Sequence, residues 1–464
     1  MHFRLIYDDD LAQAAYLIGC QRTGEAIVID PARDVDRYLR AAGEAGLKIV
    51  AAAETHVHAD FLSGARELAE LGVKAYVSGC AGPDWTPKWL GSKAGGGSYD
   101  HHVLADSDKI KVGNITLIAH HTPGHTPEHV SYGVIDADAG EPMGVATGDF
   151  VFVGDLGRPD LLESAAGVKG TREPGARELW KSTSWFRSLP EYAQVWPGHG
   201  AGSACGKALG AVPQSTVGYE LRHNAALRIE GEDAFVRAIL DGQPDPPGYF
   251  ARMKRMNVEG APVLGALPEP KLISAGELPE PRDGVVVLDL RPWGEFRAGH
   301  VPGSLNADLD NIFTATIGSY IEPHHHVYMV AHPEQAADAV RRLVRVGIDR
   351  FEGYALPEEL GSRASATLGE VGVESARAEA DVVLDVRRTD EYTAGHVPGA
   401  VHICHTQLAG RLDELPTGAR VNVICKGGRR SARASALLAK NGFTPVNVAG
   451  GFDAYRTIDA PVES

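Results

Sequence analysis

Short apolar runs alternate with amphipathic stretches along the N-terminal half of the chain. Residues 26–30, 49–53 and 116–119 have the composition of buried strands, whereas residues 34–46 have the spacing of a helix. Strands that alternate with helices are typical of layered α/β proteins, in which loops at the strand ends carry the functional side chains. We therefore expect one α/β domain over residues 1–245, with its site in such loops.

The pattern changes after this domain, and a repeat begins. Prolines become frequent, so we interpret residues 246–268 as a linker. Residues 288–303 then recur as residues 384–399, with ten of the sixteen positions identical. Chance does not explain such a duplication, which is typical of tandem domains. We predict two α/β modules, one over residues 269–357 and one over residues 370–464.

Composition narrows the class of protein. A length of 464 residues is too great for one core, and the formal charge of −16 opposes binding to nucleic acid or to an anionic membrane. The five cysteines are scattered without a CxxC pair, as in proteins of a reducing compartment. No stretch has the length of a membrane span or the form of a signal peptide. We expect a cytoplasmic enzyme that forms a homodimer or homotetramer, without a nucleic-acid or membrane partner.

Four loops of the first domain carry side chains that bind metals. Side chains at i and i+2 of a tight loop can face one cation, and a neighbouring glycine lets the backbone come close to it. A single histidine is more often structural, but four such loops in one domain favour a metal site. The candidate residues are His56, His58, Asp60, His125, Asp149 and His199.

Phe61 indicates that this site holds one metal ion rather than two. The run that starts at His56 would read His-x-His-x-Asp-His in a binuclear site, but its last position holds Phe61. A face of two histidines and one carboxylate around a single ion suits Fe(II) and dioxygen chemistry. The spacing alone leaves open whether His56 or His58 touches the ion.

The four loops resemble those of the metallo-β-lactamase superfamily, over about residues 1–240. More narrowly, they are similar to the persulfide dioxygenase branch, a relative of glyoxalase II. The resemblance implies an αββα sandwich and one Fe(II) per chain. The implied ligands are His56, His125 and Asp149, and the residues implied to orient them are His58, Asp60 and His199.

Two further residues of this domain are candidates for handling a sulfur substrate. The same branch carries a similar Gly-Arg-x-Asp segment, which implies that Arg158 pairs with a carboxylate of the thiol substrate. A structural pair with Asp155 or Asp160 is the alternative. Cys205 lies in a glycine-rich loop, and Lys207 would favour its thiolate. Related fusions carry a similar Ser-x-Cys-Gly-Lys segment, which implies a catalytic part in sulfur transfer, whereas a buried small apolar side chain is the alternative.

The last module contains a cysteine loop between a predicted strand and a predicted helix. Backbone N–H groups around Gly427 and Gly428 can form an anion-binding nest, and a helix that begins near Ser431 adds its positive end. These groups favour the thiolate of Cys425 and a persulfide bound on it. The side chains expected to bind substrate here are Lys426, Arg429 and Arg430.

This loop resembles that of the rhodanese family, over about residues 375–464. A cysteine phosphatase is the competing interpretation, but its loop has the form Cys-x5-Arg. Here Arg430 stands five residues after Cys425 and Ser431 occupies the sixth position, so the ring suits a single sulfur better than a phosphate. In the first module the position 96 residues earlier is Met329, and no cysteine lies nearby. We predict an inactive rhodanese-like module followed by an active one.

The whole chain therefore resembles fusions of a persulfide dioxygenase with tandem rhodanese domains. That resemblance implies a non-haem iron enzyme of sulfide detoxification, which oxidises a low-molecular-weight thiol persulfide with O2 to sulfinate or sulfite. Catalytic Cys425, with Cys205, would transfer sulfur to give thiosulfate. One alternative is a mononuclear zinc thioester hydrolase of glyoxalase II type fused to a sulfur carrier. Another is a non-catalytic sulfur-relay scaffold with a structural metal.

Overall fold

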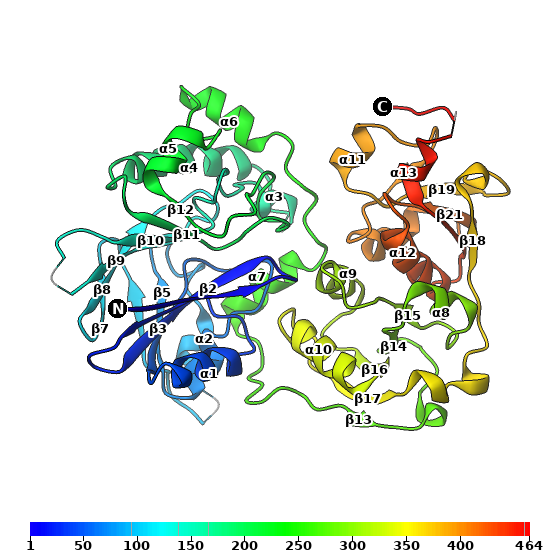
Figure 1. Ribbon diagram of the computed structural model, residues 1–464, viewed down its shortest axis with the longest axis horizontal. Helices are drawn as coiled ribbons and strands as arrows, with labels where there is room; N and C mark the ends of the chain where they lie inside the picture. Colours follow the sequence, from blue (N-terminus) through cyan, green and yellow to red (C-terminus); the bar gives the residue numbers. More distant parts are fainter. Residues whose placement is uncertain (94, 138, 166, 459) are drawn as a thin grey trace. The chain divides into compact units, whose positions relative to one another are not determined.

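The chain forms two compact units, Met1–Gly265 and Ala266–Ser464. The computed structural model describes residues 1–93, 95–137, 139–165, 167–458 and 460–464. Figure 1 follows the chain through both units. Each unit is built from strands and helices that alternate along the sequence, so the predicted α/β class is confirmed.

The first unit contains two six-stranded sheets. The order in one sheet is β1-β2-β3-β4-β5-β6, and the order in the other is β12-β11-β10-β9-β8-β7. The strands of the first sheet are β1 (His2–Asp8), β2 (Gln13–Cys20), β3 (Glu25–Ile29), β4 (Lys48–Ala53), β5 (Lys74–Ser78) and β6 (His101–Leu104). Those of the second sheet are β7 (Lys109–Val112), β8 (Ile115–His121), β9 (Val130–Asp136), β10 (Gly144–Gly148), β11 (Gln194–Pro197) and β12 (Ser215–Thr216).

Strand β2 shows how the layers pack. Its alternate side chains point to opposite faces, as the pleat of a strand requires. Tyr16 and Ile18 enter the core between the two sheets, while Ala15 and Leu17 pack in the cluster that holds the helices of the first sheet. A separate apolar cluster holds helices against the second sheet. Helices therefore cover both outer faces, which confirms the αββα sandwich.

The helices of this unit lie between the strands in sequence or follow them. Helices α1 and α2 belong to the cluster of the first sheet, and α4 and α6 to that of the second. The bounds are α1 (Asp36–Glu44), α2 (Ala65–Glu70), α3 (Leu161–Ser164), α4 (Arg172–Arg187), α5 (Val217–His223), α6 (Glu232–Leu240) and α7 (Phe250–Glu259).

The segment interpreted as a linker, residues 246–268, instead contains a helix of the first unit. Most of this segment lies inside Met1–Gly265, and it includes α7. Asn257 on α7 donates from Nδ2 to the carbonyl oxygens of His58 and Phe61, both at 2.8 Å. The prolines of this segment frame the helix rather than loosen it, because polar and apolar contacts hold α7 on the domain.

The second unit contains two five-stranded parallel sheets with the same strand order. One is β13-β17-β16-β14-β15 and the other is β18-β22-β21-β19-β20. The strands are β13 (Lys271–Leu272), β14 (Val285–Asp289), β15 (Leu305–Asn306), β16 (His326–Val330), β17 (Phe351–Ala355), β18 (Gly369–Val371), β19 (Val382–Asp385), β20 (Val401–His402), β21 (Arg420–Ile424) and β22 (Thr444–Val448). The helices are α8 (Trp293–Ala298), α9 (Phe313–Tyr320), α10 (Pro333–Val344), α11 (Thr389–Thr393), α12 (Arg429–Lys440) and α13 (Gly451–Tyr455).

The duplicated Asp-x-Arg motif makes the same hydrogen bonds in both modules. Arg291 donates to both carboxylate oxygens of Asp289 and, at 2.8 Å, to the carbonyl oxygen of Gly299. In the second module Arg387 makes the same contacts with Asp385, and its bond to the carbonyl oxygen of the glycine there is 2.7 Å long. The repeated Asp-x-Arg pair therefore ties the end of a strand to the Gly-His-Val-Pro-Gly turn.

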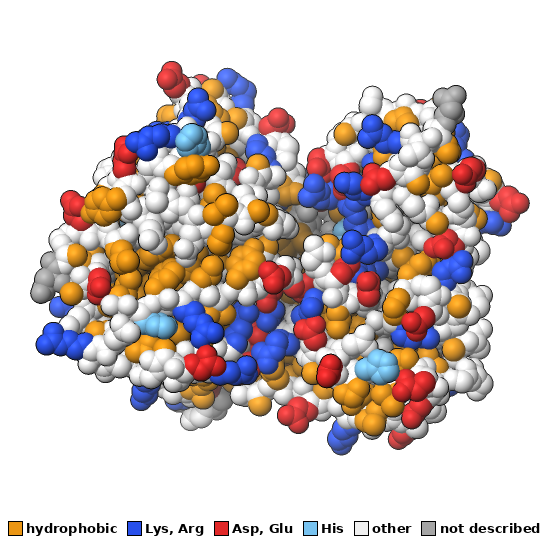
Figure 2. All heavy atoms as spheres, viewed as in Figure 1, with side chains coloured by type: hydrophobic (Ala, Val, Ile, Leu, Met, Phe, Trp, Pro, Cys, Tyr) orange, Lys and Arg blue, Asp and Glu red, His pale blue; other side chains and the backbone are white. Residues whose placement is uncertain are grey.

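The surface is polar and mixed in charge. Figure 2 shows acidic and basic side chains interspersed over the face in view. Among the residues that the structure describes, no helix combines the length and the apolar character needed to cross a bilayer.

Candidate metal centre and cysteine loop

Three buried side chains of the first unit converge on one point. The Nε2 atoms of His56 and His125 lie 3.9 Å and 3.5 Å from Oδ2 of Asp149. One potential ligand atom from each residue lies within 4.8 Å of the other two. Oδ2 of Asp149 is buried and has no hydrogen-bond partner among the described residues. An orphaned carboxylate oxygen that faces two imidazole nitrogens fits a bound cation, so the predicted ligand set is suited to one metal ion.

Strand ends and one glycine bring these ligands together. His56 follows β4, His125 lies between β8 and β9, and Asp149 follows β10 directly. Gly148 before Asp149 has a φ of 49°, and a Cβ there would lie 2.5 Å from Oγ1 of Thr55. Only glycine therefore lets β10 approach the histidine loop closely enough.

Hydrogen bonds fix how the two histidines face the ion. The single proton of the Thr55 hydroxyl goes to Asp30, so Thr55 can only accept from Nδ1 of His56, at 2.9 Å. Nδ1 of His125 donates to the carbonyl oxygen of Arg158 at 3.0 Å. Burial lowers the pKa of His56 well below its usual value and that of His125 to about 4. Both rings are therefore neutral and present an Nε2 lone pair toward the site.

His129 supports the site and was missed at the sequence level. Its ring is fully buried, stacks on His56 with centroids 5.2 Å apart, and accepts the backbone N–H of Asp149 at Nε2. Its Nδ1 lies 2.9 Å from Oγ1 of Thr122. Burial lowers the pKa of His129 to about 3, which keeps this nitrogen an acceptor. The spacing of four residues after His125 was the available signal.

His199 lies between two carboxylates, and it shares a second buried group of potential ligand atoms with Asp60 and Cys205. Nδ1 is 2.8 Å from Oδ1 of Asp149, and Nε2 is 2.7 Å from Oδ2 of Asp60. Burial alone would lower the pKa of His199, but the Asp149 and Asp60 carboxylates outweigh it and raise the pKa to about 10. A protonated ring donates on both sides, so His199 orients Asp149 and is itself held by Asp60.

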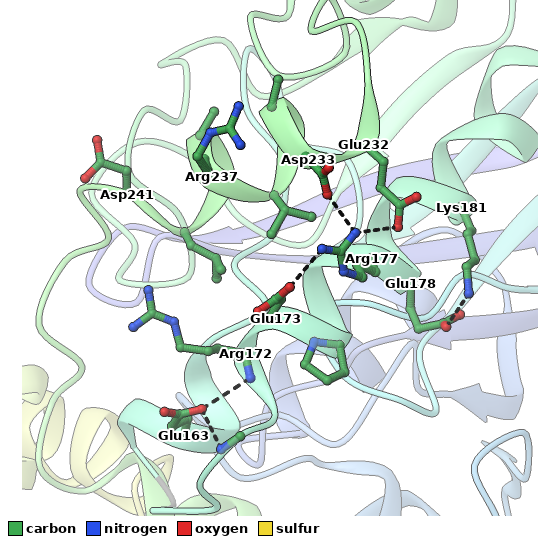
Figure 3. A pocket seen from close by; sticks show the side chains of 16 residues that line it. Glu163, Arg172, Glu173, Arg177, Glu178, Lys181, Glu232, Asp233, Arg237 and Asp241 are labelled. Atoms are coloured by element: carbon green, nitrogen blue, oxygen red, sulfur yellow. Dashed lines mark hydrogen bonds and ion pairs between the residues drawn. The ribbon is translucent and has the colours of Figure 1, made fainter.

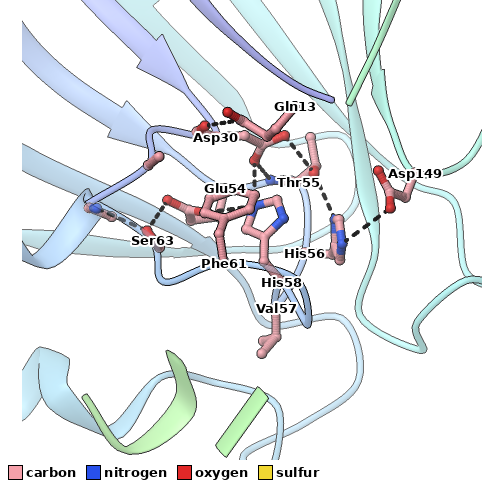
Figure 4. Close-up of polar contacts among 12 residues, drawn as sticks. Gln13, Asp30, Glu54, Thr55, His56, Val57, His58, Phe61, Ser63 and Asp149 are labelled. Atoms are coloured by element: carbon pink, nitrogen blue, oxygen red, sulfur yellow. Dashed lines mark hydrogen bonds and ion pairs between the residues drawn. The ribbon is translucent and has the colours of Figure 1, made fainter. Parts of the chain in front are cut away.

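His58 turns away from the three ligands. Its Nε2 lies 3.2 Å from Oδ1 of Asp30 and 3.0 Å from Oε2 of Glu54. The ring of Phe61 stacks on it with centroids 4.3 Å apart, which fills the space that a further histidine would occupy. Figure 4 shows His56 directed at Asp149 and His58 directed at the other carboxylates. The geometry thus separates the two histidines that the spacing could not distinguish.

Arg158 is structural in this arrangement, contrary to the substrate-binding role expected for it. Its Nε and Nη2 donate to the two carboxylate oxygens of Asp160 at 2.9 Å and 2.7 Å. Its Nη1 donates to the carbonyl oxygens of Ala204 and Pro244. The side chain is 1% exposed. The guanidinium of Arg158 therefore holds three segments together by hydrogen bonds. The backbone carbonyl of the same residue positions the ring of His125.

Cys205 lies beside the proposed metal centre, and its surroundings differ from those expected to favour a thiolate. Its thiol lies with Asp60 and His199 in a second buried cluster of potential ligand atoms. Lys207 points elsewhere and donates to the carbonyl oxygens of Ala238 and Asp241. Burial and the charge of Asp149 raise the pKa of the Cys205 thiol well above its usual value. The side chain is a neutral thiol beside the carboxylates.

A small cavity of about 30 Å³, large enough for one or two water molecules, adjoins His56. Trp85 and Trp89 form apolar walls, and Glu128 lines it with a buried Oε2 that has no hydrogen-bond partner among the described residues. Nζ of Lys254 on α7 lies 4.4 Å from the ring centroid of Trp85. Burial lowers the pKa of Lys254 to about 8 against the opposing charge of Glu128. The cavity thus combines aromatic walls with the buried carboxylate of Glu128, and Lys254 adjoins it through Trp85.

A larger hollow of about 1520 Å³ lies between α4 and α6 and has a different character. Figure 3 shows Arg177 at its centre, paired with Glu173, Glu232 and Asp233. Lys181 pairs with Glu178 at its rim, and none of the lining residues belongs to a metal-binding cluster found in the described residues. This hollow is a solvated groove and not the reactive site.

The cysteine loop of the second unit holds its sulfur at the start of a helix. Sγ of Cys425 accepts from the backbone N–H of Gly428 at 3.1 Å and from Oγ of Ser431 at 3.3 Å. Gly428 has a φ of 98° and caps α12, which begins at Arg429, two residues earlier than expected. The N–H groups and the positive helix end favour a negative sulfur at this place.

Two of the three cations expected to bind substrate are engaged with carboxylates. Arg430 donates to both oxygens of Glu391 at 2.6 Å and 2.8 Å. Arg429 pairs with Asp310 at 3.0 Å. Lys426 is exposed, and the ion pairs of the described chain do not include it. Arg429 and Arg430 were expected to bind substrate, but carboxylates of the protein already neutralise their charges. Lys426 remains available to bind substrate.

The first module lacks the loop altogether. The sheet register pairs Asp289 with Val330 and Asp385 with Ile424, so Ala331 stands where the second module has Cys425. Sequence counting pointed to Met329, because it missed two additional residues between the paired strands of the first module. Helix α10 begins at Pro333, which leaves no room for a ring of N–H groups. No sulfur can be carried at this position.

Comparisons with known proteins agree with this architecture. The profile of the metallo-beta-lactamase superfamily matches residues 8–199, and that of the rhodanese-like domain matches residues 274–355 and 372–457. The crystal structure of a metallo-beta-lactamase from Staphylococcus aureus subsp. aureus COL is 40% identical with a TM-score of 0.68, and the match covers 77% of this chain and 99% of that one. A probable metallo-hydrolase of Burkholderia pseudomallei is 30% identical over 60% of this chain and 98% of its own length.

Two other relatives match a smaller share of the chain, and the chain spans less than two thirds of the length of each. The mitochondrial persulfide dioxygenase ETHE1 of Bos taurus is 29% identical over 35% of this chain and 58% of its own length. The cytoplasmic hydroxyacylglutathione hydrolase of Arabidopsis thaliana is 30% identical over 40% of this chain and 62% of its own length. Oxygenase and hydrolase relatives are thus about equally similar. The family matches nevertheless agree with the two sandwiched sheets and the buried His/Asp cluster, and the chain belongs to the metallo-β-lactamase superfamily, with two rhodanese-like domains after its metal-binding domain.

Proposed function

We propose that the protein is a persulfide dioxygenase with one Fe(II) per chain, coupled to a sulfurtransferase. The observation that carries the proposal is the position of His199, both of whose nitrogens contact carboxylates. With His199 engaged and Phe61 stacked on His58, the group of His56, His125 and Asp149 keeps a buried carboxylate oxygen without a hydrogen-bond partner among the described residues. Two histidines and one carboxylate leave the other positions of the ion open for substrates.

The bound iron would supply open coordination positions for a persulfide sulfur and O2 together. The net reaction is R–S–S⁻ + O2 → R–S–SO2⁻, and water then gives R–SH and hydrogen sulfite. In this reaction Thr55 and the Arg158 carbonyl hold the two imidazoles in the required tautomer. His199 and His129 hold the side chain and the backbone of Asp149. His56, His125 and Asp149 would hold the ion, and the surrounding residues keep their side chains oriented for that task.

The surface around the cavity beside His56 would contact the organic part of the thiol persulfide. Trp85 and Trp89 give it apolar contact, and Lys254 offers a positive charge to a carboxylate of the substrate. Lys254 thereby takes the role that Arg158 cannot fill. The neutral thiol of Cys205 lies on the side of the centre that holds Asp60, where it would accept sulfur only after losing its proton.

The cysteine loop would complete the sequence of reactions. Cys425 takes the outer sulfur of a second persulfide, Cys–S⁻ + R–S–S⁻ → Cys–S–S⁻ + R–S⁻, and sulfite then removes it as thiosulfate. The N–H of Gly428 and the hydroxyl of Ser431 stabilise the sulfur that remains on the protein. Thiosulfate is the expected final product.

A zinc thioester hydrolase fused to a sulfur carrier is the second candidate, favoured by the similarity to hydroxyacylglutathione hydrolase. One experiment separates the two candidates. Protein purified without oxygen and loaded with iron or zinc is given a glutathione persulfide or an S-(hydroxyacyl)glutathione thioester. We expect O2 uptake with iron and persulfide and no thioester hydrolysis. Thioester hydrolysis by the zinc form without O2 uptake by the iron form would establish the hydrolase instead.

A further inference from the structure

Two carboxylates of the first rhodanese-like module contact arginines of α12, the helix that follows the Cys425 loop in the second module. After β15 the chain reaches Asp310, whose Oδ2 lies 3.0 Å from Nη1 of Arg429 and whose Oδ1 lies 2.8 Å from Nη2 of Arg433. Asp308 contacts Nη2 of Arg433 through its carbonyl oxygen and through Oδ1, at 2.9 Å and 2.7 Å. Two carboxylates of the first module thus contact the first two turns of α12 in the second.

Asp310 is held in place for this contact. Its Oδ1 accepts the backbone N–H of Ile312 at 3.0 Å, and its carbonyl oxygen accepts from Nη1 of Arg342 at 3.0 Å. The Asp310 side chain is 13% exposed and that of Arg433 is 1% exposed, so solvent screens the pair little. Arg429 and Arg433 are one helical turn apart, so a single carboxylate reaches both.

These pairs change the charge that an incoming anion meets. Arg429 and Arg433 are balanced by Asp310 and Asp308, and Arg430 is balanced by Glu391. A dianion gains twice as much from a positive site as a monoanion does, so it also loses twice as much when the site is neutralised.

We propose that Asp308 and Asp310 of the inactive module set the anion preference of the Cys425 loop. They weaken its binding of dianionic thiosulfate relative to a thiol persulfide, whose reacting end carries one charge. Thiosulfate formed at Cys425 therefore leaves, and the loop reacts again with persulfide. The inference rests on the proposed sulfur transfer at Cys425, and it gives the module without a cysteine a role as a specificity element.

The test is Asp310→Asn in the full-length protein, with thiosulfate as sulfur donor and cyanide as acceptor, S2O3²⁻ + CN⁻ → SO3²⁻ + SCN⁻. We expect the KM for thiosulfate to fall by roughly fivefold, with kcat nearly unchanged, because one opposing charge near the loop is removed. The KM for a thiol persulfide donor should change less. High salt should reduce the difference between variant and wild type.

Two controls and a second variant make the outcome specific. Asp310→Glu keeps the charge and should restore the wild-type KM. Glu280→Gln removes the same charge from an exposed ion pair with Arg363 in the same module and should have no effect. Asp308→Asn provides a second test if Asp310→Asn does not fold, because Asp308 is half exposed and should lower the same KM.

Failure of this inference can be distinguished from failure of the proposed sulfur transfer. Variants that fold and retain the wild-type KM for thiosulfate would overturn the inference, as would equal losses of kcat with both donors, which indicate a purely structural contact. A wild-type protein that transfers sulfur from neither donor would instead contradict the proposed function itself.

Discussion

The metal centre and the cysteine loop are built in opposite ways. The proposed ligands His56, His125 and Asp149 come from three loops of the first unit and meet only when both sheets have formed. The Cys425 site is almost contiguous, because the loop and the first turn of α12 supply both contacts to its sulfur. The geometry of the metal centre therefore depends on the whole first unit. The Cys425 loop depends on the rest of its own unit mainly for the charges that surround it.

The surroundings of the two sites differ as well. In the metal centre, His199 and His129 sit behind Asp149 and fix its direction. In the cysteine loop the neighbouring charges come from Glu391 and Asp310 and neutralise arginines that would otherwise attract anions. We therefore expect substitutions at the first site to affect metal retention and those at the second to affect substrate preference. Four predictions test this contrast, from the largest effect to the smallest.

The largest effect is expected from His125→Ala. The variant lacks one of three metal ligands, so persulfide-driven O2 uptake should fall to background while sulfur transfer by Cys425 continues. O2 electrode traces and a thiocyanate assay on the same preparation measure both activities. Retained O2 uptake would remove His125 from the ligand set, and loss of both activities would contradict independent sites.

Cys425→Ser should give the opposite result. Serine cannot carry sulfur, so thiocyanate formation should fall to background, while O2 uptake with persulfide is unchanged and sulfite accumulates in place of thiosulfate. Cys80→Ser is the matched control, because Cys80 lies outside both sites. Thiosulfate formation by the Cys425→Ser enzyme would show that the loop is not the transfer site.

His199→Gln should have an intermediate effect. The variant loses the protonated ring that bridges Asp60 and Asp149, and removal of such a supporting partner typically lowers metal affinity or activity by about 10–100-fold. Iron retained after dialysis against a chelator measures the change. His102→Gln, which removes an exposed histidine paired with Asp108, should retain wild-type iron. Equal retention of iron by the His199→Gln protein would contradict the role assigned to this ring.

The smallest effect is a pH dependence from Lys254. Its pKa is lowered to about 8, so the side chain is charged below that pH and neutral above it. The KM for a carboxylate-bearing persulfide should therefore rise several-fold between about pH 7 and about pH 9. Lys254→Met should show a high KM without this rise, and exposed Lys88→Met should behave as wild type. A wild-type profile in the Lys254→Met enzyme would place the substrate elsewhere.

The sequence predicted those parts of the molecule that depend on short segments. Residues 26–30 and 49–53 form β3 and β4 within one residue of the expected bounds, because buried strands have a strong local signature. The duplicated motif and the strand-end histidine loops were visible for the same reason. The α/β class and the duplication follow from these local patterns, whereas the αββα sandwich and the rhodanese-like fold were implied by the resemblance to known families.

Where the structure differs from the sequence predictions, the cause is contact between residues far apart in the chain. Arg158 is spent on Pro244, 86 residues away, and Arg429 on Asp310, 119 residues away. The proline-rich segment contains α7 because Asn257 and Lys254 find partners on the first domain. No local pattern records such contacts, so the side chains that bind substrate could not be distinguished from those that brace the fold.

The most direct test of the central claim is the metal content of protein purified without oxygen, together with O2 uptake on addition of a defined persulfide. We expect one iron per chain and one O2 consumed per persulfide oxidised. Two metal ions per chain, or a zinc-loaded protein as active as the iron form, would contradict it.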